Sequence, residues 1–319
     1  MMMATPLVET VGLNKFFKRP NGMLHAVEDI NLKISAHSTL GVVGESGCGK
    51  STLGRTLLRL TPATSGKVLF EGEDILQYGK AAMKRVHRDM QMIFQDPYSS
   101  LDPRMTIYDL IAEPVRELYG HSLRRTELDE RVHHIMELCG LPRRYAGCYP
   151  HELDGGRRQR VGLARAMVVE PKFIVCDEPV SALDVSIQAQ ILNLLMDLQQ
   201  QRGLSYMFIT HDLCVVRHIS DEIMVMYMGQ AVEYACKDEL FRNPQHPYTR
   251  ALLSAIPTTN LSRRNRERHM LKGEVSSPID PAPGCRFVPR CPYASEKCKA
   301  ECRLRETAPG HYVACHLCG

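Results

Sequence analysis

The sequence lacks the features of a membrane-spanning, secreted or strongly nucleic-acid-binding protein. It contains no run of about 18 apolar residues, so no segment is predicted to cross a bilayer. Its first residues, MMMATPLVET, lack the basic and apolar regions of a signal peptide, so we expect a cytosolic protein. The formal net charge of +4 is too small to indicate nucleic acid as a partner. Internal repeats and low-complexity segments are also absent.

The composition is otherwise that of a soluble globular protein, except for its cysteines. The 319 residues are 44% hydrophobic and 24% charged, and they suffice for one large domain with an appendage or for two domains. The 12 cysteines are many, and half of them lie near the C-terminal end: Cys285, Cys291, Cys298, Cys302, Cys315 and Cys318. In a reducing cytosol such a cluster indicates metal binding rather than disulfides.

Short apolar segments alternate with helical patterns over the first 240 residues. Buried strands are predicted at TLGVVGES (39–46), MQMIFQDP (90–97), KFIVCDEP (172–179), LSYMFITHD (204–212) and EIMVMYMGQAVEYA (222–235). Helices are predicted after the first strand, over 187–203, and at amphipathic patterns within 106–140. This alternation indicates an α/β fold with a mostly parallel sheet, into which a helical region at 106–165 is inserted.

The amino-acid composition changes after about residue 240. The segment NPQHPYTRALLSAIP is punctuated by prolines, and the basic segment NLSRRNRERHMLKGE (260–274) is predicted to be a solvated linker. The cysteine-rich end follows this linker.

The segment GESGCGKS (44–51) matches the phosphate-binding pattern G-x-x-x-x-G-K-[ST] at every fixed position, between a predicted strand and a predicted helix. Gly44, Gly47 and Gly49 let the backbone fold around phosphates with its N–H groups directed inward. Lys50 offers a charge to the β- and γ-phosphates, and Ser51 offers a hydroxyl to Mg²⁺. A glycine-rich turn with an incidental lysine is the alternative, which this context disfavours.

An acidic pair ends the strand FIVCDEP. Asp177 is placed to hold Mg²⁺ through water, and Glu178 is placed to orient or deprotonate an attacking water. Such a pair alone is a weak signal, but together with the phosphate loop it predicts a nucleoside triphosphatase that uses Mg²⁺.

Further motifs in order make the chain resemble the ATP-binding cassette (ABC) family of transporter ATPases over about residues 6–240. The resemblance implies a P-loop NTPase fold with an N-terminal antiparallel β subdomain and a helical subdomain at about 98–165. It implies that Gln95 in FQDP senses Mg²⁺ and the membrane partner, that Asp184 in SALD is the D-loop aspartate, and that His211 contacts the γ-phosphate. Phe17 falls where the family places an aromatic residue against adenine, with Phe16 as the alternative. The expected nucleotide-contacting residues also include Glu45, Ser46, Cys48 and Thr52.

The remaining segments, among them GCRFVPRCPYASEKC and GHYVAC, resemble the oligopeptide/dipeptide/nickel importer subfamily, and most of all the second ATPase of a peptide permease. Residues 241–319 would then form that subfamily's C-terminal extension. The resemblance implies a peripheral subunit at the cytoplasmic face of the inner membrane, which forms a head-to-tail dimer with a similar ATPase. Two membrane permeases, received by the region 96–140, and a secreted binding protein complete such an importer. Peptides and nickel complexes are both open as substrates.

The family's Leu-Ser-Gly-Gly-Gln signature, which contacts the γ-phosphate bound by the opposite subunit, is replaced here. The chain has Leu153 followed by Asp154, Gly155, Gly156 and Arg157. In one interpretation Asp154 repels the phosphate, by about 4 kcal/mol per charge pair at 4 Å, and the site is impaired. In the other, which we favour, Asp154 caps the helix and Arg157 compensates its charge.

The cysteine tail predicts a metal site. Cys285, Cys291, Cys298 and Cys315 match the subfamily pattern, in which some relatives carry a [4Fe–4S] cluster; Zn²⁺ and no metal are the alternatives. We expect any metal here to be structural.

Two other classes are disfavoured. A soluble cassette ATPase of translation or repair usually has two cassettes or long coiled-coil arms, whereas this chain has one cassette and no sustained heptads. A non-catalytic nucleotide-binding subunit is disfavoured because Glu178 and His211 are present.

Overall fold

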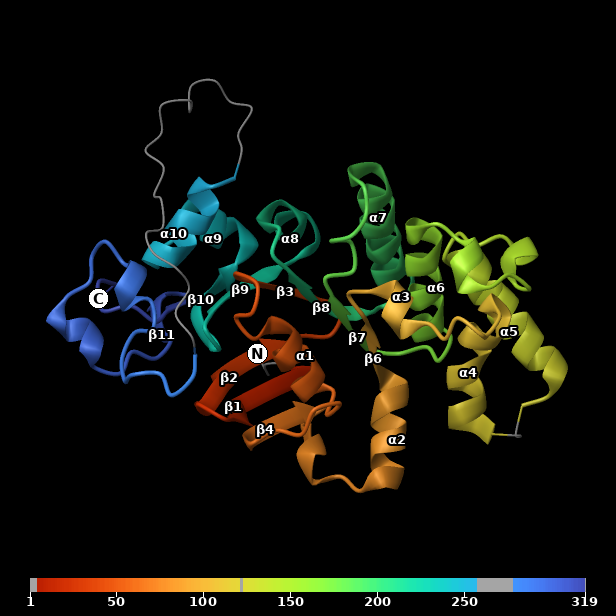
Figure 1. Ribbon diagram of the computed structural model, residues 1–319, viewed down its shortest axis with the longest axis horizontal. Coiled ribbons are helices and arrows are strands. Elements are labelled where there is room, and N and C mark those ends of the chain that lie inside the picture. Colours follow the sequence, from red (N-terminus) through yellow and green to blue (C-terminus); the bar gives the residue numbers. More distant parts are fainter. Residues whose placement is uncertain (1–4, 121–122, 257–277, 319) are drawn as a thin grey trace.

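The computed structural model describes residues 5–120, 123–256 and 278–318, and the predicted linker at 260–274 lies outside them. Two β-sheets form the framework of this part of the chain, and helices cover them (Figure 1). The strands are β1 (Val8–Arg19), β2 (Gly22–Ile34), β3 (Thr39–Val43), β4 (Ser65–Phe70), β5 (Glu73–Asp74), β6 (Met90–Ile93), β7 (Phe173–Asp177), β8 (Ser205–Thr210), β9 (Glu222–Tyr227), β10 (Gln230–Cys236), β11 (Arg305–Ala308) and β12 (His311–Val313). The helices are α1 (Lys50–Leu57), α2 (Lys80–Asp89), α3 (Pro97–Ser100), α4 (Ile107–Tyr119), α5 (Arg125–Leu138), α6 (Gly155–Met167), α7 (Val185–Arg202), α8 (Leu213–Ile219), α9 (Lys237–Arg242) and α10 (Pro247–Ser254).

The larger sheet has the strand order β11-β12-β10-β9-β3-β8-β7-β6 within the described residues. From β9 to β6 the neighbouring strands are all parallel. Strands β3, β7 and β8 are buried at every position, as continuous apolar runs in a covered parallel sheet require. The mostly parallel core sheet predicted from the sequence is therefore confirmed, and its strands end at a common edge.

One strand prediction was wrong. The segment 222–235 is not a single strand but the antiparallel pair β9 and β10, which turns at Met228 and Gly229. Both turn residues have positive φ, +45° and +84°. The apolar run continues through the turn, so only the glycine marked it in the sequence.

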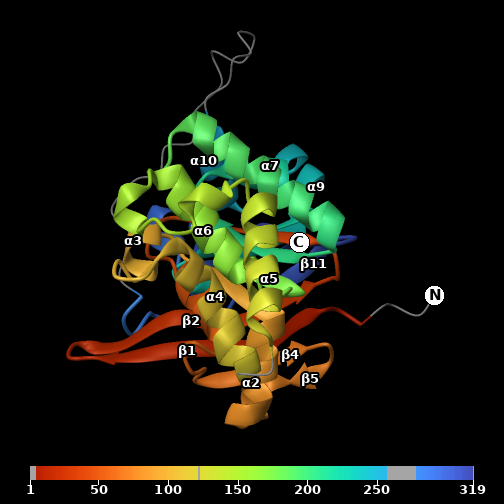
Figure 2. The ribbon, with the colours of Figure 1, turned by 90° about the vertical axis from the view of Figure 1, so that its right-hand side faces the viewer.

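The smaller sheet is antiparallel and has the order β2-β1-β4-β5 in the described part of the chain (Figure 2). Its long strands β1 and β2 pair from Val8 and Ile34 to Arg19 and Gly22, with several register shifts. This is the N-terminal antiparallel unit that the family resemblance implied.

The helices α3 to α6 follow β6 in the chain and precede β7, and they lie at one end of the molecule (Figure 1). Their apolar faces pack together with α7 around fully buried residues such as Ile111, Val132 and Val161. Helix α4 begins at its cap Thr106, whose side chain accepts a hydrogen bond from Asp109 N–H, and it tolerates Pro114 in its interior. No helix in the described residues is long and apolar enough to cross a membrane.

The cysteine-rich segment after residue 278 folds onto the β9–β10 edge of the larger sheet, at the opposite end of the molecule (Figure 1). Strand β12 pairs with β10, and Phe287 is buried against Tyr227 and Tyr248. Arg286 donates hydrogen bonds to the Met228 carbonyl and to the Glu28 carboxylate of β2. This segment therefore shares its core with the main sheet.

Candidate functional site

The candidate site lies where strands β3, β8, β7 and β6 end at the same edge of the sheet. The phosphate-loop motif follows β3, His211 follows β8, the acidic pair ends β7, and Gln95 follows β6. Open parallel sheets place their ligand sites outside the carboxyl ends of the strands. The topology thus gathers residues that are far apart in sequence, as in the hydrogen bond between Ser51 and Asp177, which are 126 positions apart.

The lysine of the phosphate loop, Lys50, bonds to the backbone of the same loop. Lys50 Nζ donates hydrogen bonds to the Gly44 and Glu45 carbonyls at 2.8 and 2.9 Å, and Lys50 is only 4% exposed. Gly49 precedes helix α1, so the first N–H groups of that helix are directed into the loop. A loop of this form, with a cation and helix N–H groups at its centre, is suited to binding phosphates.

Two glycines of the loop are required by close backbone contacts. Gly44 has φ of +156° and Gly49 has φ of +105°. A Cβ at Gly44 would lie 2.2 Å from the Met226 carbonyl oxygen, and one at Gly49 would lie 2.0 Å from that of Ala26. Neither backbone oxygen can move without displacing its strand, so larger residues cannot be accommodated.

Ser51 and Asp177 form the part of the site that suits Mg²⁺. Ser51 Oγ donates a hydrogen bond of 2.6 Å to Asp177 Oδ1. Asp177 is fully buried, its Oδ2 atom has no hydrogen-bond partner among the described residues, and Arg55 Nη2 is 4.0 Å away from it. Burial raises the pKa of Asp177, although the Ser51 hydroxyl opposes that shift. A hydroxyl beside an unsatisfied carboxylate oxygen is a donor set that fits a hard divalent cation.

Gln95 and His211 converge on one carboxylate oxygen of Glu178. Gln95 Nε2 lies 3.2 Å from Glu178 Oε2, and His211 Nδ1 lies 3.3 Å from the same atom. Glu178 has φ of +46°, a strained value for a residue with a side chain. Its side chain is 12% exposed, so the carboxylate faces a partly desolvated site. A carboxylate with two such neighbours is chemically able to orient a water molecule and to accept its proton.

The Asp154–Arg157 segment begins helix α6 with a satisfied cap. Asp154 is the N-cap, its Oδ1 accepts a 2.8 Å hydrogen bond from Arg157 N–H, and its Oδ2 forms an ion pair with Arg157 Nη1. The predicted cap and the predicted pairing are both present. Gly156 is required here, because a Cβ would lie 2.6 Å from Ile187 of α7, the helix that Asp184 caps. Helix α6 lies among the inserted helices, whereas the phosphate loop lies in the middle of the molecule (Figure 1).

This geometry agrees with similarity to known proteins. Residues 27–181 match the ABC transporter family, and residues 232–298 match the C-terminal region of oligopeptide/dipeptide transporters. The chain is 49% identical over 304 residues to the oligopeptide transport ATP-binding protein AppF of Bacillus subtilis (strain 168), covering 94% of this chain and 92% of that protein. It is 50% identical over 302 residues to the oligopeptide transport ATP-binding protein OppF of Salmonella typhimurium, covering 94% of this chain and 90% of that protein.

The chain belongs to the ABC transporter ATPases.

Solved ABC structures share the fold of this ABC ATPase. The cassette MJ0796, in a dimeric post-hydrolysis state bound to ADP and Pi, superposes with a TM-score of 0.67 at 26% identity, covering 72% of this chain and 98% of that one. The cbiO1 protein of Clostridium perfringens, part of the transporter complex cbiONQ, gives a TM-score of 0.66 at 26% identity, covering 75% of this chain and 92% of that one. The predicted P-loop ABC ATPase fold is confirmed.

Two aromatic residues of this ABC ATPase were predicted to meet adenine. Phe16 stacks on His25 with ring centroids 4.1 Å apart, whereas the Phe17 ring lies beneath Lys15 Nζ at 4.6 Å. The Phe17 assignment stays a prediction.

The cysteine tail does not form a ready metal site in the structure. Among residues 5–120, 123–256 and 278–318, no group of three or more His, Cys, Asp or Glu side chains is arranged to hold a metal ion. The thiols are nevertheless neighbours. Burial raises the pKa of Cys285 to about 11, and Cys302, Cys298 and Cys315 add to that shift. The predicted ligands thus lie in one region without converging, so as they stand they do not fit a cluster.

Sequence analysis missed the residues that contact the phosphate loop from the C-terminal extension. Arg290 pairs with the Glu45 carboxylate, and the Tyr248 hydroxyl accepts a hydrogen bond from Glu45 N–H. No motif marks these residues, because each contact joins positions more than 200 residues apart.

Proposed function

We propose that this ABC ATPase hydrolyses ATP to drive import of di- or oligopeptides through a membrane permease. The observation that carries the proposal is the convergence of Gln95 and His211 on Glu178, next to the Ser51–Asp177 pair. The peptide substrate is supported by relatives of 49% and 50% identity that are oligopeptide transport ATP-binding proteins. A nickel-chelate importer is the second candidate of the same subfamily.

In this proposal the chain's own residues bind and position the nucleotide. The loop 44–51 and Thr52 hold the phosphates, and an aromatic residue of β1, Phe17, stacks on the base. Ser51, Asp177 and Gln95 would hold Mg²⁺, which would neutralise charge on the bound phosphates. Glu178 accepts the proton of the attacking water, and His211 binds the γ-phosphate.

The proposed assembly is a head-to-tail dimer with a similar ATPase, most simply a heterodimer. Asp154, Gly155, Gly156 and Arg157 at the start of α6, with Asp184, complete the partner's nucleotide site. The location of α6 among the inserted helices, away from the chain's own phosphate loop, supports this role (Figure 1).

We assign permease docking to a cleft beside the inserted helices. The cleft has a volume of about 390 Å³ and is lined by residues of β6, α4 and α6 and of the segments beside α3, among them Phe94, Leu101, Glu113 and Gln159. It lies next to Gln95, so a permease segment seated there can influence the Mg²⁺ site. Docking would place the chain at the cytoplasmic face of the membrane as a peripheral subunit, with residues 6–240 as the cassette and 241–319 as the extension.

A structural [4Fe–4S] cluster on Cys285, Cys291, Cys298 and Cys315, or Zn²⁺ in its place, would require these neighbouring thiols to move together, because among the described residues they do not converge. Iron, zinc and sulfide analysis of anaerobically purified protein decides among the cluster, zinc and no metal.

Replacing Glu178 with glutamine in the reconstituted transporter tests the function. We expect ATP turnover to fall by about 100-fold or more while ATP still binds, because glutamine cannot accept a proton. Glu9→Gln on β1 is the control, since it removes another partly buried carboxylate contact, 3.2 Å from Lys33 Nζ, away from the site. Unchanged turnover by Glu178→Gln would refute the assignment, and ATP-dependent uptake of labelled nickel but not peptide would favour the second candidate.

A further inference from the structure

The C-terminal extension reaches into the phosphate loop through an arginine. Arg290 Nη1 and Nη2 donate to Glu45 Oε2 and Oε1 at 2.7 and 3.0 Å, so the two planar groups meet edge to edge. The Arg290 side chain is 7% exposed and that of Glu45 is 25% exposed. A bidentate pair so shielded from water is stronger and more directional than an ordinary surface ion pair.

A second contact holds the backbone of the same loop residue. The hydroxyl of Tyr248, a fully buried residue on α10, accepts a 2.9 Å hydrogen bond from Glu45 N–H. The Tyr248 ring packs edge-on against Tyr227 with centroids 4.8 Å apart, and Phe287 of the extension lies 5.4 Å from Tyr248. The carboxylate and the amide of Glu45 are therefore both fixed by residues that follow the cassette.

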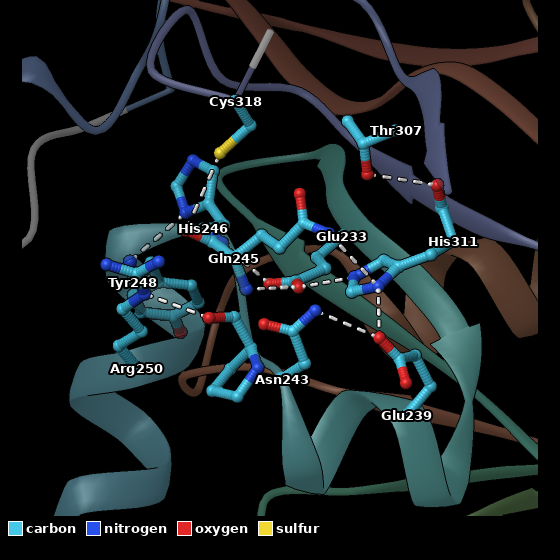
Figure 3. Close-up of polar contacts among 11 residues, drawn as sticks. Glu233, Glu239, Asn243, Gln245, His246, Tyr248, Arg250, Thr307, His311 and Cys318 are labelled. Carbon is cyan, nitrogen blue, oxygen red and sulfur yellow. Dashed lines mark hydrogen bonds and ion pairs between the residues drawn. The ribbon is translucent and has the colours of Figure 1, made fainter. Parts of the chain in front are cut away.

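The beginning of α10 is in turn tied to the last strand of the extension by a buried carboxylate (Figure 3). Glu233 on β10 accepts hydrogen bonds from Gln245 N–H at 2.7 Å and His246 N–H at 3.0 Å. His311 on β12 lies 2.8 Å from the same carboxylate, and both Glu233 and His311 are fully buried. The position of Tyr248 at the phosphate loop thus depends on the docked state of the cysteine-rich segment 278–318.

We propose that Arg290 and Tyr248 are positioning residues of the nucleotide site, and that they couple ATP binding to docking of the cysteine-rich extension. The carboxylate of Glu45 belongs to the loop that must accept a triphosphate, and an unpaired carboxylate there repels the phosphates. Arg290 neutralises that charge, while Tyr248 fixes the loop backbone. Because coupling between two binding equilibria is reciprocal, bound nucleotide must also stabilise the docked extension. This inference rests on the proposed ATP site.

The test measures Mg²⁺–ATP binding by the full-length protein, with a fluorescent ATP analogue, and KM and kcat by the assembled transporter. We expect Arg290→Ala to raise Kd and KM by about tenfold with a smaller change in kcat, because the loop is mispositioned but the catalytic residues remain. Adding Glu45→Gln to Arg290→Ala should recover most of that loss, since the unpaired charge is then removed. Arg290→Lys, which keeps the charge but not the paired geometry, should fall between. Arg303→Ala, at a 70% exposed arginine of the same extension, is the control.

Hydrogen exchange of residues 285–318 with and without nucleotide measures the reverse coupling. Nucleotide should slow exchange there in the wild type and have little effect in Arg290→Ala. Wild-type Kd in Arg290→Ala, or no recovery in the double variant, would overturn this inference while leaving the ATP site intact. Failure of the wild-type protein to bind ATP would instead overturn the proposed function.

Discussion

The signature segment offers a sharp test because its two unusual residues are expected to compensate each other. Asp154 caps α6 and is paired with Arg157, and their side chains are 56% and 45% exposed. Replacing Asp154 with serine keeps a good cap and removes the charge, whereas alanine removes both. Replacing Arg157 with glutamine leaves the carboxylate at the helix start unopposed.

The stability effects follow from the local contacts. A lost cap costs about 1 kcal/mol, and an exposed ion pair contributes at most about 1 kcal/mol. We therefore expect Asp154→Ala to lower the free energy of unfolding by about 1–2 kcal/mol and Asp154→Ser by less than about 1 kcal/mol. Thermal melting should show a decrease of about 2–4 °C per kcal/mol.

The expected catalytic effects follow from the proposed position of this segment at the γ-phosphate bound by a partner subunit. An unopposed carboxylate about 4 Å from one phosphate charge costs roughly 4 kcal/mol at an effective dielectric constant near 20. Because Arg157 offsets Asp154, we expect Asp154→Ser to change ATP turnover of the complete transporter by less than about threefold. Arg157→Gln should lower turnover by about tenfold or more, and Asp154→Ser/Arg157→Gln should restore it.

ATP turnover by Arg157→Gln at the wild-type rate would contradict compensation between the two residues. An increase in turnover of more than about tenfold in Asp154→Ser would also contradict it, since the carboxylate would then be repelling phosphate despite its partner.

Two further predictions concern the phosphate loop and the Mg²⁺ ligand. Gly49→Ala should lower the free energy of unfolding by about 2–4 kcal/mol and abolish ATP binding, because its Cβ would lie 2.0 Å from the Ala26 carbonyl oxygen. Gly79→Ala, which has open space at its Cβ, is the matched control in melting and binding assays. Equal melting temperatures of the two variants would contradict the prediction. Burial raises the pKa of Asp177 above its usual 3.8, so the folded, Mg²⁺-free protein favours the protonated carboxyl. The stability that this preference contributes is fully present below pH 3.8 and is lost as the pH rises through the raised pKa. Asp177→Asn should remove that dependence of stability on pH and stabilise the Mg²⁺-free protein at neutral pH by about 1–3 kcal/mol. It should also eliminate the stabilisation of the protein by Mg²⁺–ATP. Lower stability of the variant than of the wild type, in thermal melts without Mg²⁺ across pH, would contradict the prediction.

Local sequence determined the parts of this protein whose physics is local. The segment GESGCGKS requires a tight backbone around anions, and its position between an apolar run and a helix was enough to locate β3, the loop and α1. The apolar run before Asp177 and Glu178 likewise located β7 and its end. Asp154 was recognised as a helix cap because capping involves residues only three positions apart.

Tertiary structure decided what depends on contacts between distant segments. It placed Gln95 and His211 around one carboxylate oxygen of Glu178, an arrangement that spacing alone does not determine. It divided the apolar run 222–235 into a hairpin, because pairing with β3 and β12 requires two strands there.

The contact between Arg290 and Glu45 also depends on the tertiary structure. Arg290 and Glu45 are 245 residues apart, and nothing near either residue indicates the other. They meet because the extension adds β12 to the edge of the core sheet and buries Phe287 against Tyr248. The sequence by itself determined a phosphate-binding ATPase core, since turns, caps and strand ends are short-range features. Only the fold decided that the cysteine-rich end helps to hold that core's nucleotide loop, since burial and pairing across 245 positions are properties of the packed chain.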